Sequence, residues 1–246
     1  MKNVIATLIA LLIFKCTLFS QIAEPSKGVE KNTLQIELES IYSVQKENSS
    51  TIKSWSIPNL LLRYGLFKNL EMQFNAPLIR EKLIEHDELI YAINKFDDIQ
   101  IGFALNLWEQ HKWIPETAFL YRSVLHSKPN LKFLNVGNVY SLNFSNNLNE
   151  KLTFTNNIGY ATEKTSGYTY FIVSNLDYSY SSKTNFLIEY SCNDTKESGI
   201  FQSITVGMGY ALNKNITVEY SVAKGIDHNL LYTGGRLTYV IESLFH

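Results

Sequence analysis

Residues 98–108 read DIQIGFALNLW, and this stretch decides the fold. Every odd-numbered position from 99 to 107 carries a large apolar side chain, whereas the even-numbered positions from 98 to 106 carry polar or small ones. Successive side chains of a β-strand point to opposite faces of the sheet. The stretch therefore predicts a strand with one apolar face and one polar face.

The same period-two alternation recurs on both sides of this stretch, almost to the end of the chain. Pro58 and Pro115 lack the N–H group that a strand donates, so a bulge or a strand end is expected at each. The pattern predicts an all-β, antiparallel protein of about twelve strands. The expected ranges are Leu34–Tyr42, Ile52–Tyr64, Leu70–Ala76, Asp98–Trp108, Trp113–Leu125, Leu131–Phe144, Leu152–Ala161, Tyr168–Tyr180, Asn185–Cys192, Ile200–Tyr210, Ile216–Ala223 and Tyr232–Ile241.

The segments between the predicted strands alternate in length. Short polar turns are expected at Gly65–Asn69, Glu109–Lys112, Ser145–Lys151, Ser181–Thr184 and Ala211–Asn215. Longer links are expected at Pro77–Asp97, Thr162–Gly167, Asn193–Gly199 and Lys224–Asn229. Short periplasmic turns and longer extracellular loops are typical of bacterial outer-membrane barrels. The alternation predicts a transmembrane β-barrel with both termini on the periplasmic side, because a β-sandwich has no reason to keep it.

The first twenty residues predict an export signal. A basic start at Lys2 precedes an apolar run from Val4 to Phe14. A helix of that length spans about 16 Å, which is too short for a bilayer core of about 30 Å. A short apolar run behind a basic start is typical of a cleaved signal peptide. We expect residues 1–20 to be removed after Ser20, and residues 21–246 to form the barrel in the outer membrane.

The charge balance argues against a nucleic-acid partner. The chain carries 22 basic and 23 acidic side chains, and a nucleic-acid-binding protein calls for a clustered basic surface instead. The 15 Tyr and 14 Phe residues favour pleated strands. After removal of the leader, Cys192 is the one cysteine left. An intramolecular disulfide is therefore not expected to hold the fold together.

The apolar strand faces are expected to point outward. Twelve strands enclose a lumen too wide for side chains to fill simply, so a soluble barrel with apolar faces inside would need a ligand or a plug. A charge on a lipid-facing surface at mid-bilayer costs about 2–4 kcal/mol, and the predicted apolar faces carry none. A barrel with apolar faces toward lipid is thus self-consistent.

The outward apolar faces leave the polar faces around a solvated lumen. Its acids outnumber its bases, which would favour cationic or neutral solutes. The same residues could instead form an arginine–carboxylate network that braces the barrel, and the sequence leaves both readings open. The candidates for the lumen and the solute path are Arg63, Glu71, Asp98, Glu116, Arg122, Asp177, Glu189, Glu219 and Arg236, together with Glu37 and Glu39.

The link Pro77–Asp97 departs from the strand pattern. Its apolar residues Ile79, Leu83, Ile90 and Ile93 fall near helical spacing. A short helix folded over or into the lumen and an ordinary extracellular loop both fit this spacing. The sequence leaves open whether residues 77–97 plug the lumen.

The sequence contains no close histidine pair, paired-cysteine motif or glycine-rich phosphate loop. Neither a metal site nor a cofactor is expected, and we expect no enzymatic activity. Two alternatives remain. His126 and His228 fall in expected extracellular links, where a barrel enzyme acting on envelope lipids could place its site. The other alternative is a soluble periplasmic β-sandwich that binds a ligand.

Four short motifs of this sequence are similar to motifs of a known protein family. They are NLLLRYGLFKNLE at 59–71, DIQIG at 98–102, FLIEY at 186–190 and GRLTY at 235–239. With these motifs the chain resembles the outer-membrane transporter family associated with meta-pathway phenol degradation, in which an inward arginine, matched by Arg63, opens the Arg-Tyr-Gly-Leu turn. The family's glycine before Asp98 is replaced by Asp97, and its usual lysine after Gly102 is missing.

The resemblance implies a passive outer-membrane channel for small, often hydrophobic or aromatic molecules. The expected partners are then outer-membrane lipid, the small-molecule solute, and the barrel-assembly machinery that inserts the protein.

Overall fold

The computed structural model describes residues 23–47, 49–128, 132–164, 167–196 and 199–243. Among these residues, no helix is long and apolar enough to cross a membrane. Strands account for nearly all of the regular structure. They are β1 (Leu34–Glu47), β2 (Ser50–Phe67), β3 (Leu70–Glu85), β4 (Glu88–Phe96), β5 (Ile99–Trp108), β6 (Glu116–Lys128), β7 (Lys132–Asn147), β8 (Leu152–Glu163), β9 (Gly167–Ser179), β10 (Thr184–Thr195), β11 (Gly199–Ala211), β12 (Ile216–Gly225) and β13 (Asn229–Ile241).

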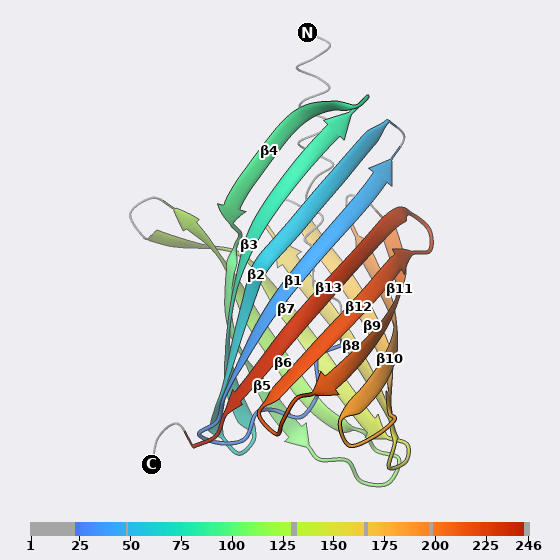
Figure 1. Cartoon of the computed structure of the whole chain (residues 1–246). Helices are drawn as coiled ribbons and strands as arrows, with labels where there is room; N and C mark the ends of the chain where they lie inside the picture. Colours follow the sequence, from blue (N-terminus) through green and yellow to red (C-terminus); the bar gives the residue numbers. More distant parts are fainter. Residues whose placement is uncertain (1–22, 48, 129–131, 165–166, 197–198, 244–246) are drawn as a thin grey trace.

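Twelve of these strands close into one antiparallel barrel (Figure 1). Neighbours in sequence pair from β5 to β13, and β13 then pairs with β1. The ring closes through β1–β2, β2–β3 and β3–β5. The predicted antiparallel barrel of about twelve strands is confirmed. A single sheet that closes on itself is not the two-sheet sandwich considered as an alternative.

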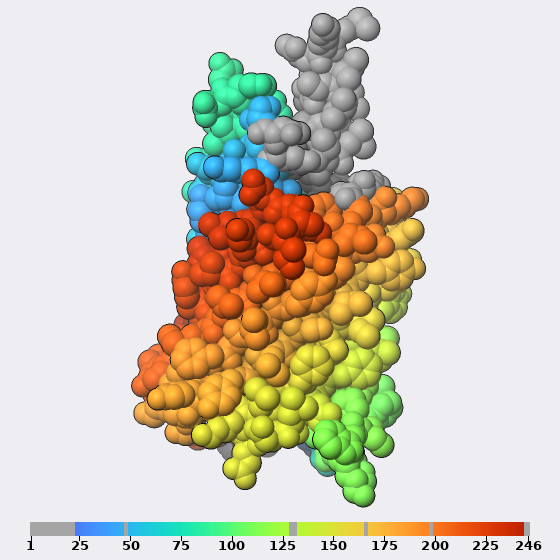
Figure 2. Space-filling view, turned by 90° about the vertical axis from the view of Figure 1, so that its right-hand side faces the viewer, coloured from blue at the N-terminus to red at the C-terminus, as the bar shows by residue number. Residues whose placement is uncertain are grey.

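The barrel is apolar outside and polar inside. In β10, Ile188 is 50% exposed on the outer surface, whereas the neighbouring Glu189 is 1% exposed. The same alternation places large apolar side chains over the slanting strands β8–β13 that face the viewer in Figure 2. Exposed apolar strand faces are stable against lipid and costly against water. This is the arrangement of a barrel embedded in a bilayer.

Residues 77–97 form a hairpin and not a helix. Strand β3 continues through Glu85, pairs there with β2, and returns as β4, so the hairpin rises above the ring (Figure 1). His86 and Asp87 have φ angles of 47° and 66°, the left-handed conformations that a tight two-residue hairpin turn uses. The spacing of Ile79 and Leu83 fits a strand as well as a helix, because four residues are two full strand periods. Of the two possibilities left open for this link, the helix is wrong, and in place of an ordinary loop the residues form a strand hairpin that lines one side of the cavity.

The predicted difference in loop length between the two ends is also wrong. Strand β8 runs to Glu163 and β9 resumes at Gly167, β10 runs to Thr195 and β11 resumes at Gly199, and β12 runs to Gly225 and β13 resumes at Asn229. The widest separation between barrel strands other than the hairpin lies at the opposite end, at residues 109–115. The extensions at Thr162–Glu163 and Asn193–Thr195 carry only polar side chains, so the sequence shows no apolar–polar alternation there.

The two proline expectations are confirmed. The pairing of β2 with β3 shifts register between Ser56 and Asn59, around Pro58. Strand β6 begins at Glu116, directly after Pro115. Each proline thus lies where the ladder has no donor to lose.

Candidate functional site

The lumen contains the chain's own segment before the first strand, residues Ala23–Lys31, which we call the luminal segment. The Ala23 N–H donates to Glu189 Oε2 at 2.6 Å, and the Glu24 N–H donates to Asn157 Oδ1 at 2.7 Å. Asn157 returns the bond, its Nδ2 donating to the Glu24 carbonyl at 2.8 Å. These partners lie on β8 and β10, so the segment's first residues are held against that side of the wall.

The luminal segment continues to the end of the barrel where β1 starts. The Val29 N–H donates to Glu71 Oε2 at 2.7 Å, and Lys31 forms a bridge with Gly65. A Cβ atom at Gly65 would lie 2.0 Å from the Glu30 carbonyl oxygen, which no side chain tolerates. The glycine of the Arg-Tyr-Gly-Leu motif is therefore required by this close backbone approach.

Arg63 and Glu71 form the most buried ion pair of the lumen. Arg63 Nε and Nη2 donate to the two Glu71 carboxylate oxygens at 2.9 and 3.0 Å, and the Glu71 side chain is fully buried. Gln73 Nε2 also donates to Glu71 Oε1 at 2.6 Å. Two-point arginine–carboxylate contacts are strong and directional. Here the pair joins β2, β3 and the luminal segment.

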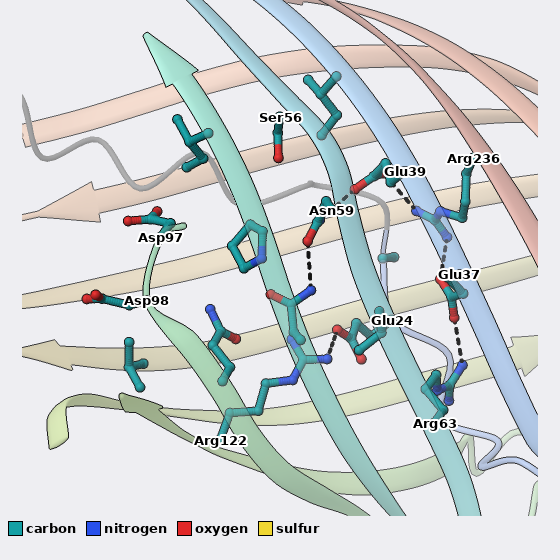
Figure 3. Close-up of a pocket in the computed structure, with 18 of the residues that line it drawn as sticks. Glu24, Glu37, Glu39, Ser56, Asn59, Arg63, Asp97, Asp98, Arg122 and Arg236 are labelled. Atoms are coloured by element: carbon teal, nitrogen blue, oxygen red, sulfur yellow. Dashed lines mark hydrogen bonds and ion pairs between the residues drawn. The ribbon is translucent and has the colours of Figure 1, made fainter. Parts of the chain in front are cut away.

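A second cluster surrounds Arg236 on β13 (Figure 3). Its guanidinium lies 3.5 Å from carboxylate oxygens of Glu37, Glu39 and Glu219. Glu37 links this cluster to Arg63 at 3.7 Å. The cluster thus spans β12, β13, β1 and β2, across the place where the first and last strands meet.

Arg122 on β6 holds the luminal segment from the opposite wall. Its Nη2 donates to Glu24 Oε1, and its Nε donates to Gln73 Oε1 at 2.8 Å. Figure 3 shows the Arg122 side chain reaching across the lumen toward Glu24. Glu24 is the one charged residue of the luminal segment that reaches an arginine among the ion pairs found in the described residues.

A cavity of about 830 Å³ lies within the barrel and is lined by residues of the wall, the hairpin and the luminal segment. Ala23, Glu24 and Pro25 contribute to its lining, so the luminal segment bounds it on one side. Nine carboxylates and five lysine or arginine side chains line it. The lining is therefore acidic on balance. Lys95 and Lys164, which the sequence did not single out, are among the bases.

One part of the inner wall is apolar. Ala104, Leu120, Val139 and Ala161, from β5 to β8, form a buried cluster. Val124 and Phe171 pack against it, and the Phe171 ring lies over Gly159, where a Cβ atom would be 2.0 Å from it. The inner face of β5 to β8 thus carries a buried apolar patch, whereas Arg122 on β6 reaches the cavity beside it.

The sequence candidates fall into three groups. Glu71 and Glu189 are buried beside the luminal segment, outside the cavity lining. Glu116 lies apart and accepts a hydrogen bond from Asn106 at 3.1 Å. The remaining eight line the cavity: Glu37, Glu39, Arg63, Asp98, Arg122, Asp177, Glu219 and Arg236. The luminal segment itself was missed, since residues 23–31 carry no strand alternation and no recognisable motif.

The two histidines considered for catalysis each meet a carboxylate. His126, which lies in β6 and not in a loop, has Nδ1 2.7 Å from Asp98 Oδ1, and His228 Nδ1 lies 2.5 Å from Asp227 Oδ1. Burial raises the pKa of Asp227, but hydrogen bonds from the Gln202 backbone and His228 outweigh it and hold the pKa below its ordinary value. The described residues contain no group of three metal-ligating side chains. No observation favours the enzyme alternative.

The comparisons with known proteins bear on the fold. No family model and no curated protein matches the chain. The COG4313 outer membrane channel from Pseudomonas putida F1 is similar in structure, with a TM-score of 0.66, 9% identity, and coverage of 89% of this chain and 100% of that one. The CymD monoaromatic hydrocarbon channel gives a TM-score of 0.50 at 8% identity, covering 88% and 90%.

Barrels with a different described role are similar as well. The translocator domain of the autotransporter NalP from Neisseria meningitidis has a TM-score of 0.55 at 9% identity, covering 98% of this chain and 95% of that one. At such low identities the likeness establishes a barrel of the outer-membrane type and leaves activity to be argued from the lumen.

Proposed function

We propose that this chain is a passive outer-membrane channel for small molecules, with the luminal segment as its internal constriction. The observation that carries the proposal is the 830 Å³ cavity inside a closed barrel, bounded on one side by the luminal segment. A cavity of this size suits small molecules. Its acidic excess favours neutral and cationic solutes over anions.

The apolar part of the cavity lining supports a solute with a hydrophobic or aromatic part. Leu61, Val124 and Leu187 line the cavity together with the charged cluster of Arg236 and offer such contact surface. This agrees with the solutes named for the CymD channel and with those implied by the motif resemblance to the phenol meta-pathway transporters. Membership of that family is part of the proposal.

The location follows from the same features and is also proposed. Residues 1–20 would be removed after export. The barrel-assembly machinery would then insert the protein, with its apolar outer surface in contact with outer-membrane lipid. The hairpin β3–β4 and the extended ends of β7 to β12 would then project to the outside, with Leu34 and Ile241 at the periplasmic end.

Conductance of the purified protein in planar bilayers tests the channel and its constriction together. Gly65→Ala drives a methyl group against Glu30, and Glu24→Gln removes the ion pair to Arg122. Both variants are expected to increase conductance several-fold over wild type. Gly235→Ala is the matched control, since its Cβ atom meets nothing closer than 3.7 Å.

The outcomes separate clearly. A protein that runs as a folded, heat-modifiable band but conducts in none of these forms is not a channel. Equal conductance of wild type, Gly65→Ala and Glu24→Gln would show that the luminal segment does not constrict the path.

A further inference from the structure

Four basic side chains gather on the outer face of β1, β2 and β3, at the end of the barrel where the β3–β4 hairpin rises (Figure 1). On β2, Ser54 is buried and lines the cavity, so its neighbour Lys53 points outward. On β3, Glu81 lines the cavity, so Arg80 and Lys82 on either side of it point outward. With the exposed Lys46 of β1 they form the outer basic patch, which is Lys46, Lys53, Arg80 and Lys82.

The charges of the outer basic patch are close together and are not balanced by carboxylates. Lys53 and Lys82 are direct partners across the β2–β3 ladder, and Arg80 belongs to the next pair on the same face. Direct cross-strand partners have Cβ atoms about 4.5–5.5 Å apart, and like charges there repel. None of the ion pairs found in the described residues includes a member of the patch. The other residues paired with its members are uncharged: Val44, Thr51, Trp55, Ala92, Asn94 and Asn229.

Two aromatic residues of β2 give the level of the patch relative to the bilayer. Trp55 and Tyr64, which is paired with the exposed Met72, both lie on the outer face and are nine residues apart. At about 3.3 Å per residue and a tilt of about 40°, they are about 23 Å apart along the barrel axis, close to the apolar band of about 25 Å that aromatic girdles flank. Lys82 Nζ lies 5.7 Å from the centre of the Trp55 ring. The patch is therefore at the level of lipid headgroups.

Apolar side chains continue from the patch toward the ring on the same outer face. Ile57, two residues from Trp55, is 50% exposed. Phe96 is 72% exposed and is paired with Leu78, two residues from Arg80. A ligand that satisfies both regions has an anionic group at the patch and an apolar group beside it. A phosphorylated lipid has this chemistry, because its phosphate pairs with bases and its acyl chains cover the apolar surface.

We infer that the outer basic patch binds the phosphate groups of a phosphorylated lipid of the outer leaflet, whose acyl chains lie along the apolar surface around Ile57. Arg80 offers a planar, two-point contact to one phosphate, and the paired Lys53 and Lys82 supply further positive charge. The bound phosphate removes the repulsion between the two lysines and so stabilises β2 and β3 above the ring. The inference rests on the proposed outer-membrane location, with the hairpin outside, and on no property of solute transport.

Binding of diphosphoryl lipid A to the purified, folded protein tests the site. Native mass spectrometry in a non-ionic detergent counts the bound molecules as the lipid is added. Wild type should prefer diphosphoryl lipid A about tenfold or more over phosphatidylcholine, whose phosphate is balanced by its own choline. Dephosphorylated lipid A keeps the acyl chains and should lose this preference. Diphosphoryl lipid A should also raise the Tm of the wild-type protein.

Lys53→Gln combined with Lys82→Gln removes both paired charges and should weaken the binding of diphosphoryl lipid A about tenfold or more. The matched control is Lys68→Gln combined with Lys214→Gln, the same change of charge at lysines 91% and 77% exposed in turns at the opposite end. It should leave the binding unchanged. Heat-modifiable gel migration shows whether each variant is folded. If the first double variant does not fold, Arg80→Gln alone should weaken binding several-fold.

Several results overturn the inference. They are equal binding of diphosphoryl lipid A and phosphatidylcholine, a preference that survives dephosphorylation or the lysine substitutions, and an equal loss in the control. Heparin that binds as tightly as diphosphoryl lipid A, with the same dependence on the two lysines, would assign the patch to a soluble polyanion instead. None of these readouts requires solute flux. A conducting barrel without this lipid preference would therefore refute the site and leave the channel standing.

Discussion

Replacing Glu71 with glutamine tests whether the lumen's charges brace the barrel. The substitution removes one charge of a fully buried pair whose two contacts are 2.9 and 3.0 Å long. Breaking a buried pair costs about 3–5 kcal/mol, because the remaining charge loses its partner. Two features reduce this figure. Glutamine keeps one oxygen that can accept from Arg63, and Glu37 remains 3.7 Å from the guanidinium.

The free energy of unfolding is therefore expected to fall by about 2–3 kcal/mol, allowing for those two features. With a urea dependence near the upper end of the usual range, about 3 kcal/mol per molar, the midpoint should drop by roughly 1 M. Unfolding from phospholipid vesicles, followed by tryptophan fluorescence, measures the midpoint. Heat-modifiable gel migration shows whether the variant was folded at the start.

The matched control is Glu219→Gln, which makes the same chemical change at the cavity. The Glu219 side chain is 21% exposed and lies 3.5 Å from Arg236, which two further carboxylates hold. Water and these neighbours should limit its loss of stability to about 1 kcal/mol or less. It should instead lower cation preference, measured as the reversal potential across a salt gradient. Equal destabilisation by the two substitutions would contradict the idea that Glu71 braces the barrel whereas Glu219 only lines the cavity.

Three further predictions follow from the fold. Epitope tags inserted in Thr162–Gly167 or Asn193–Gly199 should be labelled on intact cells, whereas a tag in Ser181–Thr184 should not; the reverse pattern would invert the proposed orientation. Because the pKa of Asp227 lies below its ordinary value of 3.8, the stability that it confers is present above about pH 4 and is lost as the pH falls further. The protection factor of the Gln202 amide, which is its intrinsic exchange rate divided by its observed rate at the same pH, should therefore fall on acidification in wild type, and Asp227→Asn should already lower it at pH 6. Replacing residues 78–96 with a short turn should leave a heat-modifiable barrel, since β4 pairs with β3 alone and the part of β2 that loses its β3 partner stays paired with β1; loss of the folded band would show that the ring requires the hairpin.

The ring was predictable because lipid imposes a strict alternation on every strand that crosses it. In β5 the outward residues Ile101 and Leu107 are 41% and 42% exposed, as the sequence pattern requires. The hairpin β3–β4 rises above the ring (Figure 1), and its cavity-lining face mixes Ile79 and Ile93 with Glu81 and Lys95, so no alternation marks it in the sequence. Its residues therefore fitted a helix equally well, and pairing with β2 decides the outcome.

The alternation also predicts on which face of a strand a side chain lies, but it does not predict which residue that side chain contacts. Arg63 and Glu71 were both assigned to the lumen, yet nothing in their spacing indicates a two-point contact that the Val29 N–H completes. Leu120 and Val139 point inward although they are apolar. Their side chains are 2% and 5% exposed, because they pack with Ala104, Ala161 and Phe171. The lining is thus less uniformly polar than the alternation suggests.

The sequence already contains a reason for the luminal segment, namely a wide barrel with buried carboxylates that need hydrogen-bond donors inside it. Twelve strands enclose more space than their own side chains fill, and the buried carboxylates Glu71 and Glu189 need donors inside that space. The residues just before β1 are tethered to the barrel's end and are long enough to enter it. Their backbone N–H groups supply the donors, at Ala23 and Val29. These bonds join residues 166 and 42 positions apart, a separation that local patterns cannot report. The carboxylates on the polar face of β3 and β10 are therefore the signal that something must fill the lumen, and the chain's own start is what reaches them.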